Sequence, residues 1–228
     1  MSLSKTKYIH FQQQYDVEQL QSDLAIARQS SWQNHYVKDN YEGNWSLIPL
    51  ISPGGVSNNG FAFQKDGAAP KPTETLLSCR YFNEVINAFP FPIVSARLMR
   101  LAAGSYIKPH TDHCLGYEDD SFRLHIPIVT NPQLEFILGG ERLVMAAGSL
   151  WYINANYEHS VANKGETDRV HLVIDGERND ASDEMFYAMA APEDLLTPKK
   201  QYSEEERAAI IEQMKAIGIE PSDDFFAS

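Results

Sequence analysis

Short apolar runs separated by turn residues fill the middle of the chain, between residues 94 and 175. The runs are rich in Val, Ile, Leu and aromatic residues, and pairs such as Asn131-Pro132 and Gly139-Gly140 lie between them. This texture predicts β-strands, and a spacing of roughly 8–12 residues is typical of a β-sandwich or jelly roll. The expected strands cover residues 95–101, 106–110, 122–130, 134–138, 141–145, 150–153, 159–163 and 169–175.

Two helix signals precede this strand-rich block, and a long loop lies between them. Asp16 can cap a first helix, because apolar residues follow it at i, i+3 and i+7 spacing. Thr73 can cap a second helix that runs to Phe89, where two nearby prolines end it. Gly, Pro and Asn crowd residues 52–72, which predicts a long loop. A loop of this length is typical either of a lid over a functional site or of disorder.

Helix returns after the strand-rich block. Ser203 and Glu206 form a capping box, which predicts a helix over residues 208–217. The chain contains no internal repeat, so we expect one mainly β domain over residues 1–228 with helices on both flanks. Its expected parts are a helical N-terminal flank and loop at 1–93, a strand core that carries the chemistry at 94–178, and a helical C-terminal flank at 179–228.

Composition and charge narrow the class of partner. The formal net charge is −12, whereas binding to nucleic-acid phosphates or to an anionic membrane needs a surplus of Lys and Arg. No apolar run approaches the roughly 20 residues of a membrane-spanning helix, and the polar first residues lack the apolar region of a secretion signal. Cys79 and Cys114 are too few for a disulfide framework. We therefore expect a soluble, cytoplasmic protein that does not bind nucleic acid.

A candidate metal site lies inside the strand-rich block. His110 and Asp112 are two residues apart, so on a strand both side chains project from one face. His159 is distant in sequence but can come close to them in a rolled-up sheet. Two His and one carboxylate leave positions open on iron for a cosubstrate and O2, although a catalytic zinc site also has three protein ligands. Because about one His-x-(Asp/Glu) pair is expected by chance, an exposed turn pair is the alternative.

Strand-interior arginines provide a candidate anion site. Arg169 follows His159 by ten positions, and its guanidinium could hold the distal carboxylate of a dicarboxylate through two parallel hydrogen bonds. In Arg123-x-His125 and Arg169-x-His171 a cation and an imidazole share one side of a strand. A buried Arg needs an anion to offset desolvation. That anion is either a ligand carboxylate or a Glu or Asp side chain.

Other prominent residues have ordinary explanations. Arg97 and Arg100 are three residues apart, so at most one of them faces inward from a strand. Trp151 and Tyr152 are expected in the core. Cys114 lies two residues after Asp112, and incidental placement is favoured over a role as a thiolate ligand.

Four ordered segments together resemble the aspartyl/asparaginyl β-hydroxylase-like family. They are GSYIKPHTD at 104–112, FRLHIP at 122–127, YEHS at 157–160 and DRVHL at 168–172. The resemblance implies a double-stranded β-helix of the cupin-like jelly-roll type. It also implies an oxygenase that uses Fe(II), 2-oxoglutarate and O2 and releases succinate and CO2.

The resemblance extends to individual residues. The presence of Asp112 makes the chain similar to the bacterial members with a complete ligand set, such as the proline cis-hydroxylases, and argues against a halogenase. By resemblance His110, Asp112 and His159 are the catalytic iron ligands, Arg169 binds 2-oxoglutarate, and Arg123 and His125 line the cosubstrate pocket.

We therefore expect a dioxygenase that hydroxylates a C–H bond of a small substrate, a free amino acid or a derivative. The loop at 52–72 could close over such a molecule. One alternative substrate is an Asp, Asn or Pro side chain of a peptide or protein. A cupin-like zinc or manganese hydrolase or isomerase could use the same three ligands but would not need Arg169. A non-catalytic β-sandwich binding module would need none of these residues.

Overall fold

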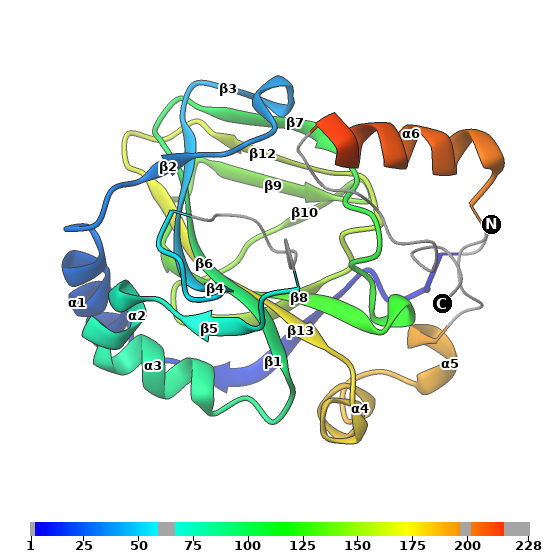
Figure 1. Cartoon of the computed structure of the whole chain (residues 1–228), viewed down its shortest axis with the longest axis horizontal. Helices are drawn as coiled ribbons and strands as arrows, with labels where there is room; N and C mark the ends of the chain where they lie inside the picture. The colour runs from blue at the N-terminus through cyan, green and yellow to red at the C-terminus, as the bar shows by residue number, and fades with distance from the viewer. Residues whose placement is uncertain (1–2, 59–66, 197–201, 217–228) are drawn as a thin grey trace.

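Two antiparallel β-sheets face each other in the computed structural model, which describes residues 3–58, 67–196 and 202–216 (Figure 1). They form a double-stranded β-helix, so the predicted mainly β, jelly-roll fold is confirmed. The larger sheet has the order β1 (Tyr8–Gln14), β11 (Ser149–Ile153), β8 (Ser121–Val129), β13 (Arg169–Glu177), β6 (Ile93–Leu101), β4 (Trp45–Pro53) and β2 (Gln33–Asn34), with β5 (Pro70–Pro72) beside β4. The smaller sheet has the order β10 (Glu141–Leu143), β9 (Leu134–Leu138), β12 (His159–Asn163), β7 (Tyr106–His110) and β3 (Tyr41–Glu42).

Every strand predicted between residues 94 and 175 is present. The bounds of β7, β9 and β12 match the prediction, and the other strands differ from it by at most two residues at either end. The period-2 alternation explains this agreement. In β13, Val170, Leu172 and Ile174 enter one core cluster, whereas Val173 enters the other.

The expectation of only helix and loop in residues 1–93 is wrong. The polar start of the chain contains β1, and β4 crosses the centre of this segment. Pro49 obscures β4 in the sequence, because proline cannot donate to a sheet ladder; the structure accommodates it where the register of β4 against β6 shifts. The predicted loop at 52–72 is also shorter, since its ends belong to β4 and β5, and its residues 59–66 lie outside the described residues.

The helices flank the sheets. They are α1 (Val17–Ala27), α2 (Glu74–Ser78), α3 (Arg80–Asn87), α4 (Asp180–Tyr187), α5 (Pro192–Leu195) and α6 (Glu204–Ala216). The predicted caps are present: Asp16 accepts from two backbone N–H groups of α1, Thr73 accepts from Leu76, and Ser203 and Glu206 bond reciprocally. Among the described residues, no helix combines the length and apolar character needed to cross a bilayer.

The single helix predicted from Thr73 to Phe89 is two helices, α2 and α3, which meet at Cys79. Cys79 has φ −108° and ψ 93°, outside the helical region. The break has a physical cause in α1. Asp23 is buried there, and its carboxylate accepts a hydrogen bond from the N–H of Phe82, so it caps the start of α3 from outside the segment.

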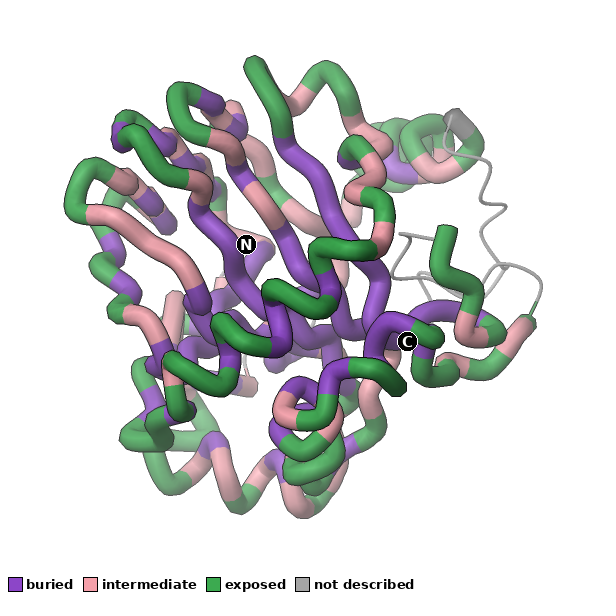
Figure 2. The backbone as a smooth tube through the Cα atoms, turned by 90° about the vertical axis from the view of Figure 1, so that its left-hand side faces the viewer, coloured by how far each residue is buried: buried purple, intermediate pink, exposed green. Residues whose placement is uncertain are grey.

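The core consists of two layers divided by the larger sheet. The outer layer joins that sheet to α1, α2, α3 and α4, which lie along it in Figure 1. The inner layer fills the space between the sheets. Figure 2 shows the long strands as continuous buried segments, with exposed residues concentrated in turns and on helices. Because Val173 belongs to the inner layer, strand alternation places Arg169, His171 and Asp175 on the same inner side.

Candidate metal centre

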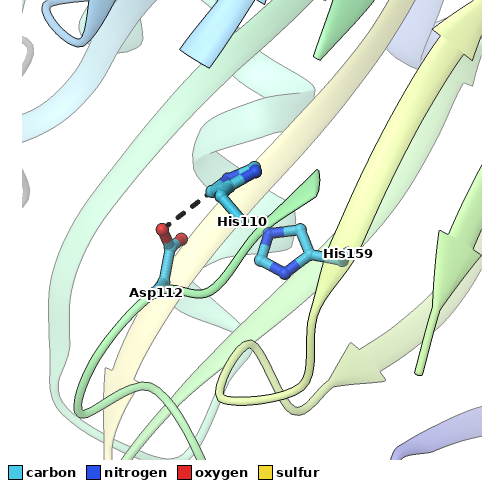
Figure 3. Close-up of side chains that lie close together, drawn as sticks. All are labelled: His110, Asp112 and His159. Carbon is cyan, nitrogen blue, oxygen red and sulfur yellow. Dashed lines mark ion pairs between the residues drawn. The ribbon is translucent and has the colours of Figure 1, made fainter. Parts of the chain in front are cut away.

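His110, Asp112 and His159 come together at one end of the smaller sheet (Figure 3). His110 ends β7 and His159 begins β12, and these two residues face each other across the antiparallel pair. Asp112 follows in the loop after β7, where its N–H donates to the carbonyl of Ala155 at 2.9 Å. One ligand atom from each of the three residues lies within 4.8 Å of the others. These side chains could therefore bind one metal ion.

Both imidazoles are oriented by backbone carbonyls. Nδ1 of His110 lies 2.8 Å from the carbonyl oxygen of Lys108, and Nδ1 of His159 lies 3.0 Å from that of Tyr157. Because a carbonyl oxygen only accepts, each Nδ1 carries the hydrogen and each Nε2 presents a lone pair. Burial lowers the pKa of His159 to about 4, despite the opposing effect of Asp112. The ring is therefore neutral at physiological pH, as a metal ligand must be.

Asp112 supplies the anionic ligand. Its carboxylate lies 3.8 Å from Nε2 of His110 and accepts a hydrogen bond from Nη1 of Arg123. Burial acts to raise the pKa of this carboxyl, but the nearby charge of Arg123 and the two histidines outweigh it and lower the pKa below its usual range. The group is thus ionised under all ordinary conditions.

The partners of Arg123 belong to the chain itself. Besides Asp112, its guanidinium bonds Asp175, with Nε 2.7 Å from Oδ1. Asp175 also accepts from Nη2 of Arg97 at 2.6 Å, and both residues are buried. The sequence left open whether a ligand carboxylate or an Asp or Glu side chain balances the charge of Arg123. These contacts show that acidic side chains of the chain itself balance it. That Arg123 contacts a cosubstrate stays a prediction. Arg97 faces inward while Arg100 is half-buried, as their spacing predicts.

Arg169 has a different environment. It is 3% exposed, and its Nη2 bonds Nδ1 of His171 at 2.8 Å. Among the described residues no carboxylate forms an ion pair with it, and burial lowers its pKa to about 9. Its Nε is buried without a hydrogen-bond partner within the described part of the chain. A buried cation without an anion is costly, so this site suits a ligand carboxylate.

His125 connects this anion site with the metal ligands. It faces the same interior, with Nδ1 3.2 Å from Nδ1 of His171. Burial, and then the charge of Arg169, lower its pKa. The ring of Phe136 lies 6.0 Å from that of His125 and 6.5 Å from that of His159. The buried cation and the metal ligands therefore lie on either side of His125 in the same interior.

A second group of buried polar atoms lies beside the metal ligands. The ring of His35 stacks on that of Trp45 at 3.5 Å, and the Trp45 ring lies 6.3 Å from that of His110. Nδ1 of His35, Nε1 of Trp45 and Nε of Arg97 are buried, and none has a hydrogen-bond partner among the described residues. The sequence contained no signal for His35, because it reaches this site from the end of β2, an edge strand of two residues.

Cys114 lies outside the three-residue cluster. Its sulfur is 3.6 Å from the hydroxyl of Tyr202, in the segment that leads into α6. This placement agrees with the interpretation that it is not a metal ligand. Trp151 and Tyr152 are both buried, as expected.

Comparisons with known proteins agree with this geometry. The family model for aspartyl/asparaginyl beta-hydroxylase matches residues 13–179. The chain is 25% identical over 196 residues to an L-proline cis-4-hydroxylase from Rhizobium meliloti (strain 1021), covering 84% of this chain and 69% of that protein. It is 27% identical over 220 residues to L-proline cis-3-hydroxylase 1 from Streptomyces sp., covering 90% of this chain and 74% of that protein.

Solved structures share the fold. One is an oxidoreductase of the 2OG-Fe(II) oxygenase family from Burkholderia pseudomallei, with TM-score 0.50 and 14% identity, covering 76% of this chain and 86% of that chain. Another is the epimerase SnoN in complex with Fe3+, alpha ketoglutarate and nogalamycin RO, with TM-score 0.51 and 11% identity, covering 76% of this chain and 80% of that chain. At this identity the likeness establishes the double-stranded β-helix alone.

Proposed function

Because the chain belongs to the aspartyl/asparaginyl β-hydroxylase family, we propose that it is an Fe(II)- and 2-oxoglutarate-dependent dioxygenase that hydroxylates a C–H bond of a free amino acid or a small derivative. One observation carries the proposal. Two histidines and an ionised aspartate converge in an interior that also contains Arg169, a buried cation without a carboxylate partner among the described residues. A zinc hydrolase would use the three ligands but would gain nothing from Arg169.

The residues fit the groups that this reaction needs. His110, Asp112 and His159 would hold Fe(II) through two Nε2 atoms and one carboxylate oxygen. Arg169 would hold the distal carboxylate of 2-oxoglutarate, whose charge offsets the desolvation of the guanidinium. When bound, iron, 2-oxoglutarate and O2 supply the oxidation of a C–H bond, with succinate and CO2 as co-products.

The chain's own contribution is positioning and exclusion of water. The backbone carbonyls of Lys108 and Tyr157 keep Nε2 of each histidine ligand free of hydrogen. Arg123 fixes one oxygen of Asp112, which leaves the other for the metal. Apolar side chains of the inner core layer, such as Phe136 and Val161, line the same interior and keep it dry.

The substrate proposal depends on the polar atoms beside the metal ligands. The ring N–H of Trp45 and the Nε–H of Arg97 are buried donors without partners among the described residues, and they suit a carboxylate. His35 adds a neutral imidazole, since burial, and then the charge of Arg97, lower its pKa to about 3. A free amino acid combines a carboxylate with a small apolar body. The two curated relatives are named for L-proline, so proline is the first amino acid to test.

The metal and the cosubstrate can be tested before the substrate is identified. Anaerobically prepared protein should bind about one Fe(II) and develop a visible charge-transfer band with 2-oxoglutarate. His110→Ala and His159→Ala should abolish that band, whereas His10→Ala, at an exposed imidazole on β1, should keep it. Succinate production is then measured with proline, the other free amino acids, their N-acyl derivatives and a peptide panel. Turnover that rises only with peptides would contradict the small-molecule proposal, and a wild-type protein that binds no Fe(II) would contradict the reaction class.

A further inference from the structure

Three buried side chains form a continuous polar row between β13 and β8. His171 lies at the centre: its Nδ1 is 2.8 Å from Nη2 of Arg169 and 3.2 Å from Nδ1 of His125. His171 is 0% exposed, and the other two are nearly as buried. Where β13 pairs with β8, Val173 lies opposite His125. His171 is two residues before Val173 on β13, so its side chain projects from the same inner face at the neighbouring position. The imidazole of His171 therefore links Arg169 to His125.

The donors and acceptors of this row can be assigned from chemistry. A guanidinium only donates, so Nδ1 of His171 must accept from Arg169 and carries no hydrogen. Nδ1 of His125 is then the donor in its longer contact with the same atom, and the two donors share the single lone pair of that nitrogen. It follows that Nε2 of His171 carries a hydrogen and Nε2 of His125 carries none. Both Nε2 atoms are buried without a partner among the described residues.

We infer that His171 is a positioning residue for the cosubstrate, which holds the guanidinium of Arg169 and fixes the tautomer of His125. This inference rests on the proposed function. Within the described residues, Nδ1 of His171 is the acceptor that orients Arg169. Fixing one N–H in this way leaves the other N–H groups of the guanidinium for a carboxylate. His171 would also contribute its Nε2–H as a second buried donor in the anion site.

The row requires that His171 stay neutral. A protonated ring would carry a hydrogen on Nδ1 and would repel Arg169. Burial first, and then the charge of Arg169, lower the pKa of His171 well below its usual range. Burial has the same effect on the pKa of His125. The imidazole of His171 therefore acts as a fixed acceptor and not as an acid or base.

The tautomers can be observed in the protein without metal or cosubstrate. With 15N-labelled histidine, long-range 1H–15N correlation spectra distinguish a protonated ring nitrogen from a bare one. His171→Asn and His125→Asn assign the two signals by their loss. We expect hydrogen on Nε2 of His171 and on Nδ1 of His125. A hydrogen on Nδ1 of His171 would overturn the inference whatever reaction the protein catalyses.

Binding of 2-oxoglutarate to the Fe(II) protein then tests the positioning role. His171→Phe keeps the size of the ring but removes the acceptor, so the dissociation constant should rise about tenfold or more while the affinity for Fe(II) stays unchanged. His171→Asn places an amide oxygen near the position of Nδ1 and should recover most of the loss. His10→Phe, the same change at an exposed position of β1, should have no effect.

The outcomes separate this inference from the proposed function. If wild type and Arg169→Ala both fail to bind 2-oxoglutarate, the function is wrong, and the tautomers remain a separate measurement. If wild type binds it, Arg169→Ala does not, and His171→Phe binds as wild type, the positioning role is wrong and the function stands. Thermal unfolding of each variant shows whether it is folded. If His171→Phe does not fold, His171→Leu replaces it, and equal affinities of His171→Asn and His171→Leu would overturn the inference.

Discussion

Arg169 is proposed to bind the cosubstrate, but burial of its charge destabilises the folded protein. Its removal should therefore affect binding much more than stability. Its guanidinium is buried without a carboxylate partner among the described residues. Arg169→Ala should weaken 2-oxoglutarate binding by roughly 2–5 kcal/mol, the cost of losing a buried charge-assisted pair. The free energy of unfolding of the metal-free protein should fall by less than about 1 kcal/mol, because removal of an uncompensated charge offsets lost packing. Titration calorimetry and urea denaturation measure the two quantities.

Two variants control this experiment. Arg169→Lys should recover only part of the affinity, since an ammonium group cannot reproduce the planar guanidinium. Arg100→Ala removes a half-buried arginine from the adjacent strand, where it pairs with Asp168 at 2.6 Å, and should leave 2-oxoglutarate binding unchanged. Unchanged affinity in Arg169→Ala would instead mean that another cation holds the cosubstrate.

At the scale of single residues, sequence spacing predicted which nearby side chains lie together. Arg169 and His171 share β13 and are in contact, as expected for residues two apart on a strand. His110 and Asp112 also come together, but Asp112 lies in the loop after β7 and not on the strand with His110. Spacing cannot predict which residues meet across strands. Asp175 was missed for this reason: it pairs with Arg97 from β6 and with Arg123 from β8, and each contact depends on strand register.

At the scale of elements, the strands of the core were predictable because each has one face toward each core layer. β4 was not, although it too has one face toward each core layer, because Pro49 interrupts its apolar run and proline cannot donate to a sheet ladder. The break between α2 and α3 was also unpredictable, because its cause is Asp23 in α1, distant in sequence. A local sequence pattern predicts the bounds of a strand or a helix only where contacts with residues distant in sequence do not change them.

The Asp23 contact gives a prediction about helix stability. Asp23→Ala leaves the N–H of Phe82 without its acceptor in a buried position, so the free energy of unfolding should fall by about 1–3 kcal/mol. Asp16→Ala removes the exposed cap of α1, which accepts from the N–H groups of Glu18 and Gln19, and should cost less than Asp23→Ala. Urea denaturation compares the two variants. Equal losses in the free energy of unfolding would show that Asp23 acts only as an ordinary helix cap. Both variants should retain Fe(II) binding.

At the scale of the whole molecule, the β-helix encloses a polar row and a metal site within a largely apolar interior. The sequence predicted the overall roll, because its short strands and turns leave few other arrangements. It could not predict how many histidines the roll buries. His35, His125, His159 and His171 are all buried, and burial lowers the pKa of each. The pKa falls to about 3 for His35 and to about 4 for His159.

These histidines make the metal-free protein sensitive to mild acid. Below the ordinary histidine pKa of about 6.5 the unfolded chain binds protons that the folded chain does not, so stability falls as pH falls. The loss continues to about pH 4 for His159 and about pH 3 for His35. Glu118 opposes this trend near its own raised pKa, because there the folded state holds the extra proton.

We therefore expect the urea midpoint of the metal-free protein to decrease steadily from pH 7 to pH 5. His171→Asn should lower the number of protons taken up on unfolding by about one, because asparagine does not titrate in either state. The urea midpoint should then depend less steeply on pH. A midpoint independent of pH over this range would mean that the buried rings take up protons in the folded protein as readily as in the unfolded chain. His171 would then lose its acceptor for Arg169 as the pH falls below the ordinary histidine pKa of about 6.5.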